Sequence, residues 1–276
     1  MTSFPWLTAI GVLPLVGSLV VALLPKSKPM LAKQVAMVVS LAVLGMTIAM
    51  ALQFDGKSTE PFQFVESYPW IPAFGVNYSV GVDGIGLVLI ALAATLVPIT
   101  ILAGWRDIEG DQESEGSVKG YFALVLVLEA LMIGVFAATD VFLFYVFFEV
   151  MLVPVYFMIG RYGGPQRAYA AVKFLLYSLL GGLFMLAALV GLYVVSARQL
   201  GSGTFDFLSL VGMDIDPNTQ KMLFLGFFFA FAIKAPLWPF HTWLPDAAAE
   251  SKPGTSVLLI GVLDKVGTFG MIRYLL

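Results

Sequence analysis

Cysteine is absent from the 276-residue chain, and histidine occurs once, at His241. The absence of cysteine excludes disulfides, iron–sulfur clusters and thiolate metal sites, and one histidine does not build a metal site alone. Charged residues are also scarce, at 12% of the sequence, and the net charge of −3 does not indicate a nucleic-acid partner. We therefore expect no redox centre, cofactor or metal within this chain and no binding to nucleic acid.

Apolar residues make up 59% of the sequence, and the mean hydropathy is +0.92. This composition is typical of an integral membrane protein, in which each spanning helix needs about 20 apolar residues. We expect an all-α, polytopic membrane fold with about eight transmembrane helices in the lipid bilayer. The predicted spans are Phe4–Leu24, Leu31–Leu52, Asp83–Gly104, Lys119–Ala138, Asp140–Gly160, Ala168–Ala197, Lys221–Leu244 and Thr255–Leu276.

The positions of lysine and arginine predict how the helices are oriented. No basic residue precedes the first span and no convincing cleavage site follows it, so we interpret it as a retained helix and not as a signal peptide. Basic residues gather in the loops after the first and fifth spans, at Lys26, Lys28, Lys33, Arg161 and Arg167. Because loops rich in Lys and Arg face the cytoplasm, we expect the N-terminus on the outside.

A charge near the bilayer centre costs at least about 2.5–3.5 kcal/mol, and among the ionisable residues inside predicted spans five stand out. They are Glu129, Glu149, Lys173, Lys234 and Lys265. Lys173 shares a helical face with Tyr169 and Tyr177, and we expect that face to point inward. Such residues indicate function by default, and the alternative is a set of static buried ion pairs.

Three further basic residues, Lys119, Lys221 and Arg273, lie near helix ends. Long basic side chains at such places commonly extend to the membrane interface, and this is our interpretation of all three.

The run AFAIKAPLWPFHTWLPDA places a lysine and three prolines inside an apolar stretch. Pro236 and Pro239 lack an amide donor and clash with the preceding turn, so the seventh helix should break just after Lys234. The carbonyl groups freed by the break can accept hydrogen bonds from the lysine ammonium or from water. His241 can pass a proton near neutral pH, and Asp246 is a further acceptor.

The last predicted span places Asp264 directly before Lys265. Adjacent residues diverge by about 100° around a helix, so the two side chains can face different partners. A buried series of carboxylates and lysines is suited to moving protons. The sequence has no GxxxxGK[ST] phosphate-binding loop and no dinucleotide fingerprint, so an energy source would belong to another subunit.

Five motifs follow one another in the chain: YSVGVDGIGL, ATDVFLFYVFFEVMLVPVYFMIG, AVKFLLYS, AFAIKAPLWPFHTWLPDA and SVLLIGVLDKVGTFG. In type and order they resemble the antiporter-like membrane subunits of proton-pumping NADH:quinone oxidoreductase, respiratory complex I, and most closely those called chain M. The resemblance covers nearly the whole chain. It implies a subunit of an enzyme that moves protons while quinone is reduced elsewhere in the complex.

The resemblance also implies roles for individual residues. Glu149 and Lys234 match the principal charged pair of the family, and Lys265 matches a lysine that relays protons toward the centre of the subunit. His241 matches a further polar relay position, and the break after Lys234 matches the family's discontinuous seventh helix.

By the same resemblance, residues 1–118 are three flanking helices with their loops, and residues 119–276 are the first of two inverted five-helix repeats. Complete subunits have about fourteen spans, so we expect this chain to be the N-terminal half of a longer subunit without its second repeat. The implied partners are other complex I membrane subunits, including neighbouring antiporter-like subunits. NADH, flavin, iron–sulfur clusters and quinone are expected in those partners, in a bacterial plasma membrane.

The chain departs from the family pattern at three positions. Ala248 stands where a second loop histidine is usual, and Lys252 replaces a usual proline. Asp264 replaces a common leucine, and either alters the protonation of Lys265 or gives it a partner.

Three alternatives remain open at this point. They are a subunit of a multi-chain sodium/proton antiporter, a subunit of a membrane-bound hydrogenase, and a structural or quinone-site subunit with static ion pairs.

Overall fold

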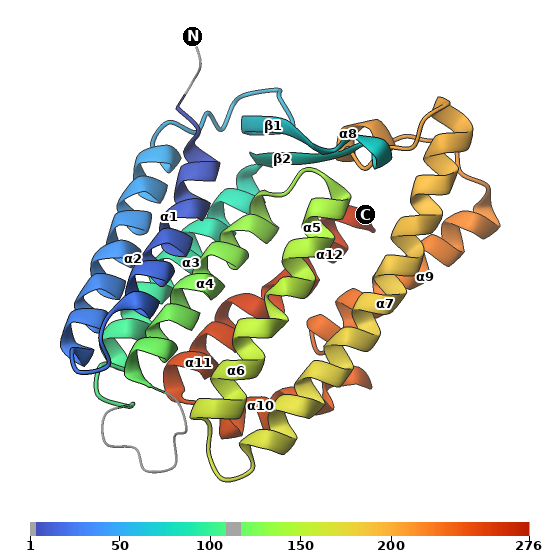
Figure 1. Cartoon of the computed structure of the whole chain (residues 1–276). Coiled ribbons are helices and arrows are strands. Elements are labelled where there is room, and N and C mark those ends of the chain that lie inside the picture. Colours follow the sequence, from blue (N-terminus) through green and yellow to red (C-terminus); the bar gives the residue numbers. More distant parts are fainter. Residues whose placement is uncertain (1–3, 109–116, 276) are drawn as a thin grey trace.

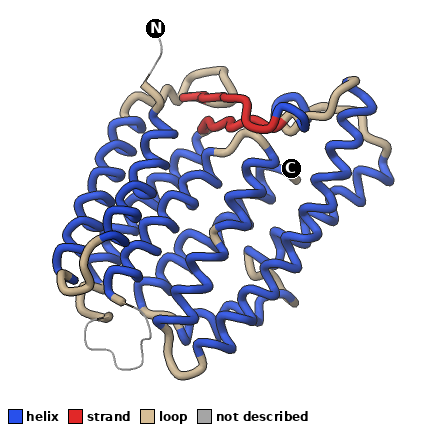
Figure 2. The backbone as a smooth tube through the Cα atoms, in the orientation of Figure 1, coloured by secondary structure: helices blue, strands red, loops and turns tan. Residues whose placement is uncertain are grey.

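The computed structural model describes residues 4–108 and 117–275, so Leu276, the end of the eighth predicted span, lies outside the described residues. Seven helical stretches within this part are long and apolar enough to cross a membrane. They are α1 (Trp6–Leu23), α2 (Pro29–Ala51), α3 (Gly84–Ala103), α4 (Val118–Ala137), the pair α5 (Val141–Val150) and α6 (Leu152–Tyr162), α7 (Arg167–Leu200), and the stretch Pro253–Tyr274. The expectation of a helical, polytopic membrane protein is confirmed (Figures 1 and 2).

The predicted seventh span is divided in the structure. Helix α9 (Pro217–Lys234) ends at Lys234, as expected from the prolines that follow. A short 3-10 turn, η2 (Phe240–Thr242), then leads into α10 (Trp243–Glu250). Helix α9 begins with the polar residues PNTQK and is not among the seven stretches above.

The last stretch also contains an irregularity. It consists of α11 (Pro253–Leu258), a π-helical turn η3 (Leu259–Leu263) and α12 (Asp264–Tyr274). A π-helical turn adds a residue to one turn and so rotates the helix that follows. Asp264 is the first residue after this turn.

Local chemistry explains where several helices begin. Asp83, Ser117, Asp140 and Asp216 precede α3, α4, α5 and α9, and each side chain accepts a hydrogen bond from a backbone amide in the first turn. These are favoured N-cap residues, because the first amides of a helix have no partner within it.

The helices pack around α4, which is the most deeply buried of the seven stretches. Helices α1, α2 and α3 cover one side of α4, and α5, α6 and α12 contact its other side. Farther out, α7 and α9 lie side by side along their length (Figure 1). Thus α5, α7, α9 and α12 meet on the side of the bundle that contains the predicted charges.

A β-hairpin that the sequence analysis did not anticipate lies across one end of the helices (Figure 2). Strands β1 (Gln63–Ile71) and β2 (Val76–Val82) are antiparallel, with Tyr68 opposite Tyr78, and the turn η1 (Pro72–Phe74) joins them. The Thr139 amide donates to the Ser79 carbonyl at 2.9 Å, which ties the hairpin to the α4–α5 connection. The short helix α8 (Phe207–Leu210) adjoins the same connection through the Phe207 amide, which donates to the Thr139 carbonyl.

Candidate functional site

Lys234 lies at the end of α9 and is 2% exposed. Its Nζ atom is 4.9 Å from the ring centroid of Phe148 in α5 and 5.9 Å from that of Phe174 in α7. No described residue hydrogen-bonds to Nζ. Contacts with aromatic faces partly stabilise a cation, but a buried charge without hydrogen bonds is costly. The charged form of this amine is therefore held without the hydrogen bonds that usually stabilise a buried ammonium.

Two carboxylates interact electrostatically with Lys234. Glu149 belongs to α5 and Asp264 to α12, so three charges from three helices face a common region. Glu149 Oε1 and Asp264 Oδ1 are buried, and neither has a hydrogen-bond partner among residues 4–108 and 117–275. We call Glu149, Lys234 and Asp264 the charge cluster. Its members interact through space without a locked hydrogen bond.

Glycines bring the helices of the charge cluster close together. A Cβ atom at Gly182 in α7 would collide with the Glu149 carboxylate, so this carboxylate occupies space that only glycine leaves open. The neighbouring Gly181 faces α9, where a Cβ atom would be 3.2 Å from the Ala230 Cα atom. The Gly181–Gly182 pair therefore makes the close helix contact that small residues permit in membranes.

The break after Lys234 satisfies its own backbone groups. The Leu237 amide donates to the Ala232 carbonyl at 2.8 Å, and the Trp243 Nε1 donates to the Ile233 carbonyl at 2.9 Å. We expected the freed carbonyls to bind the lysine ammonium. This is wrong for these two carbonyls, because each already accepts a hydrogen bond from a donor in the loop after the break. The break leaves Lys234 without those acceptors.

Lys173 pairs with Asp246 in α10, with Nζ and Oδ2 2.6 Å apart. The two side chains are 21% and 38% exposed, and the Tyr169 ring next to them is 59% exposed. The prediction that this face of α7 points inward is wrong for the described chain, because the helix is rotated to direct Phe174 inward. Tyr177 bonds Thr242 at 2.8 Å on the same side.

The remaining predicted site residues are not buried with the charge cluster. Lys265 is exposed, although Asp264 beside it is buried, as the divergence of adjacent helical residues predicted. His241 is exposed in η2, Pro236 is half-buried, and Pro239 is exposed.

Glu129 is fully buried in α4, on the opposite side of α5 from α7. Neither carboxylate oxygen has a hydrogen-bond partner in the described part of the chain. No charged side chain described here acts on it appreciably, so it is a buried acid separate from the charge cluster.

Arg273 corrects the interpretation of residues near helix ends. Its side chain is 5% exposed and pairs with Asp83 at 2.8 Å, so it is held by the protein and does not extend into solvent. Its guanidinium carbon lies 4.6 Å from the Phe269 ring centroid and 4.9 Å from that of Phe62. Sequence reasoning missed this ion pair. The one local signal for a buried Arg273 is Phe269, an aromatic residue one turn before it on the same helix. By contrast, Lys119 lies at a helix end and its Nζ bonds two carbonyls at the end of α1.

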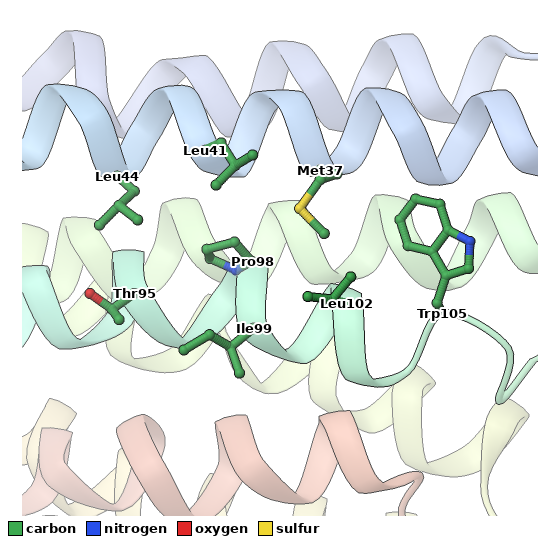
Figure 3. A pocket seen from close by; sticks show the side chains of 8 residues that line it. All are labelled: Met37, Leu41, Leu44, Thr95, Pro98, Ile99, Leu102 and Trp105. Atoms are coloured by element: carbon green, nitrogen blue, oxygen red, sulfur yellow. The ribbon is translucent and has the colours of Figure 1, made fainter.

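A groove of about 670 Å³ between α2 and α3 is apolar and remote from the charge cluster (Figure 3). Figure 3 shows Met37 and Leu41 of α2 opposite Pro98 and Leu102 of α3. Thr95 is the one hydroxyl in its wall, and it bonds the Ala91 carbonyl of its own helix at 2.7 Å. The groove therefore offers no reactive group. No set of three possible metal ligands occurs in the described residues either.

The fold and the charge cluster define a polytopic helical membrane protein with ionisable groups buried between its helices. Residues 138–276 match the family described as NADH:quinone oxidoreductase/Mrp antiporter, transmembrane, and the chain belongs to this family. A relative is the NADH-quinone oxidoreductase subunit M of Mycobacterium tuberculosis, which is 50% identical over 100% of this chain and 55% of its own length.

Two solved structures share the fold. A chain in the structure of respiratory complex I from Thermus thermophilus with bound NADH matches 97% of this chain and 52% of its own length, at 32% identity and a TM-score of 0.82. A chain of the Mrp complex from Dietzia matches 97% of this chain and 28% of its own, at 20% identity and a TM-score of 0.77, which shows the fold alone. The chain spans about half the length of the curated relatives it matches.

Proposed function

We propose that this chain is part of a proton-translocating membrane subunit of NADH:quinone oxidoreductase. The observation that carries the proposal is the charge cluster: a lysine buried at the end of an interrupted helix, facing carboxylates on two other helices. Family membership and 50% identity to a subunit M support it. Charges of this kind inside a membrane protein are retained where they bind or move ions.

In the proposed mechanism, Lys234 accepts a proton from the cytoplasmic side and Glu149 modulates how tightly the proton is held. Because the two groups share no hydrogen bond, a small change in their separation or hydration alters that affinity. Redox chemistry in other subunits supplies this change. Lys265 then receives the proton, as the family resemblance implies.

The other buried or paired groups have supporting roles in this proposal. Lys173, paired with Asp246, and the exposed His241 lie on the side where α7 meets η2 and α10, and serve proton entry. Glu129 lies within α4 and serves a separate branch of the path. Residues 119–276 form the translocating repeat and residues 1–118 flank it.

The proposed partners are the other membrane subunits of complex I, including further antiporter-like subunits. NADH, flavin, iron–sulfur clusters and quinone belong to those partners, and the cluster described here contains only side chains. The bacterial relative supports a location in a bacterial plasma membrane. The distribution of Lys and Arg supports an orientation with the N-terminus outside.

A second candidate is a subunit of a multi-chain sodium/proton antiporter or of a membrane-bound hydrogenase. The family description names the Mrp antiporter, and the fold matches a chain of an Mrp complex, which favours keeping the antiporter as the alternative. The identity to the complex I subunits is higher, which favours the first candidate.

The test compares NADH oxidation with proton pumping in membranes that carry variants of the full-length subunit. Glu149→Gln should lower both activities while the assembled complex persists, and Lys234→Ala should abolish pumping. Glu60→Gln and Lys57→Ala are matched controls, because they remove the same charges from exposed loop positions.

Each outcome points to one reading. Normal proton-to-electron stoichiometry in Lys234→Ala overturns the proposal. If NADH oxidation is untouched in Glu149→Gln but sodium tolerance collapses, the antiporter function takes its place. Equal losses in the loop controls would show that the charge cluster has no special part in pumping.

A further inference from the structure

Asp264 is a buried acid that the family pattern does not require. It is 9% exposed, and its Oδ1 has no hydrogen-bond partner among the described residues. It follows the π-helical turn η3 directly, and the next residue, Lys265, is exposed. The helix is therefore rotated so that the carboxylate, and not the adjacent lysine, points into the protein.

The packing of α12 shows what Asp264 faces. Gly267 lies one turn beyond Asp264 on the same helical face, since residues three apart are neighbours. A Cβ atom at Gly267 would be 2.6 Å from the Ala235 amide nitrogen and 2.7 Å from the Phe231 carbonyl oxygen. These backbone atoms belong to the end of α9, around Lys234. The face that carries Asp264 is thus pressed against the break that presents Lys234.

Among residues 4–108 and 117–275, two cations act appreciably on the Asp264 carboxylate. Lys234 and Lys265 both interact with its carboxylate electrostatically, and Thr268 bonds the Asp264 backbone carbonyl, not the carboxylate. Lys234 in turn is acted on by Glu149 and Asp264. Asp264 therefore stands between the buried lysine on one side and the exposed lysine on the other.

We propose that Asp264 is a second carboxylate partner of Lys234 and accepts the proton that Lys234 releases on its way to Lys265. This inference rests on the proposed function. The Lys234 ammonium and Oδ1 of Asp264 share no hydrogen bond, so the proton passes between them through water. The bonding electron pair stays on Nζ, and a charged pair becomes a neutral amine and a neutral acid. Net charge is unchanged, and a neutral pair is favoured in a site of low polarity.

This placement gives the onward step a route that Lys265 alone lacks. Lys265 is turned away from the charge cluster, so a direct transfer from Lys234 would have to pass around α12. Asp264 lies on the inner side of the same turn and is next to Lys265 in the chain. Lys234 thus alternates between Glu149 on α5 and Asp264 on α12.

The experiment measures protons pumped per NADH oxidised, as a function of pH, by the assembled complex in vesicles. The variants are Asp264→Asn, which removes the charge and keeps the shape, and Asp264→Glu, which keeps the charge. Asp55→Asn is the matched control, since it makes the same change at an exposed loop position. Lys234→Ala is the reference for loss of the proposed function.

We expect Asp264→Asn to move the alkaline limit of pumping to lower pH by about one unit, because one anion near the Lys234 ammonium is lost. The proton-to-electron ratio should fall in the same variant, and Asp264→Glu should restore both. If Asp264→Asn does not assemble, Asp264→Leu removes the charge without burying an unpaired amide.

Two results separate the possible failures. If Lys234→Ala stops pumping but the charge-free Asp264 variants keep the normal ratio and pH limit, this inference is overturned and the proposed function stands. If Lys234→Ala pumps normally, the proposed function itself fails.

Discussion

The contact between Gly182 and the Glu149 carboxylate allows the charge cluster to be disturbed without changing any charge. A methyl group at position 182 would occupy the space of the carboxylate, which is the end of a flexible side chain and can swing away. Gly182→Ala should therefore displace the Glu149 carboxylate on the order of 1 Å to restore van der Waals contact. The helices themselves need not separate.

The expected energies are small for stability and larger for function. Alanine in place of glycine favours a helix by about 0.5–1 kcal/mol, and an off-rotamer Glu149 costs about 0.5–1.5 kcal/mol, so the two nearly cancel. Two unit charges about 5 Å apart attract by about 3.3 kcal/mol at an effective dielectric constant near 20, and by about 2.8 kcal/mol at 6 Å. The difference of about 0.5 kcal/mol is roughly a 2.5-fold change in the protonation equilibrium of Lys234.

The assay is proton pumping per NADH oxidised in vesicles, together with the amount and thermal stability of the assembled complex. Gly182→Ala should lower the pumping ratio while the complex stays intact, because the protonation equilibrium of Lys234 shifts roughly 2.5-fold. Gly45→Ala is the matched control, because Gly45 is a helical glycine of α2 with nothing within 4 Å of an added Cβ atom. It should pump normally.

A double-mutant cycle identifies the cause. In a Glu149→Gln background, Gly182→Ala should add little, because the charge that it displaces is already gone. The reasoning is refuted if Gly182→Ala pumps like the wild type, or if its effect adds in full to that of Glu149→Gln.

The remaining predictions concern contacts away from the charge cluster. Asp83→Asn should lower the stability of the purified complex by about 3 kcal/mol, and more than Arg273→Met, because it leaves a 5%-exposed guanidinium unpaired whereas Asp83 is 32% exposed. Thermal unfolding measures this, and the reverse order would contradict it. Trp243→Phe should cost about 1–3 kcal/mol, because the Ile233 carbonyl loses its donor, and an unchanged melting temperature would disprove that role.

The helix break shows how far local chemistry reaches. Two closely spaced prolines after Lys234 disfavour a continuous helix, so the end of α9 was predictable there, although single prolines at Pro14 and Pro98 lie inside α1 and α3. The destination of the freed carbonyls was not, because the Trp243 indole that satisfies Ile233 approaches through the fold of the loop. The membrane-spanning helices were likewise predictable, because a helix that crosses the bilayer needs about 20 apolar residues in a row.

The direction in which each charged side chain points is decided by helix packing and not by local chemistry. Glu149, Lys234 and Asp264 are visible in the sequence as ionisable residues in apolar runs, but their convergence depends on how α5, α9 and α12 are rotated about their axes. Helix rotation is set by close contacts such as that of Gly267 with the end of α9. Sequence spacing alone indicates that Asp264 and Lys265 point in different directions, but not which of the two points inward.

By itself, the sequence determined that this protein crosses a membrane several times, that one helix breaks after Lys234, and that acids and lysines lie at membrane depth. These follow from hydropathy and backbone chemistry, which act along the chain. Only the tertiary structure decided that Asp264 faces inward while Lys173 pairs with Asp246 at an open face. Burial and partnership are properties of packed helices, and no single helix contains that information.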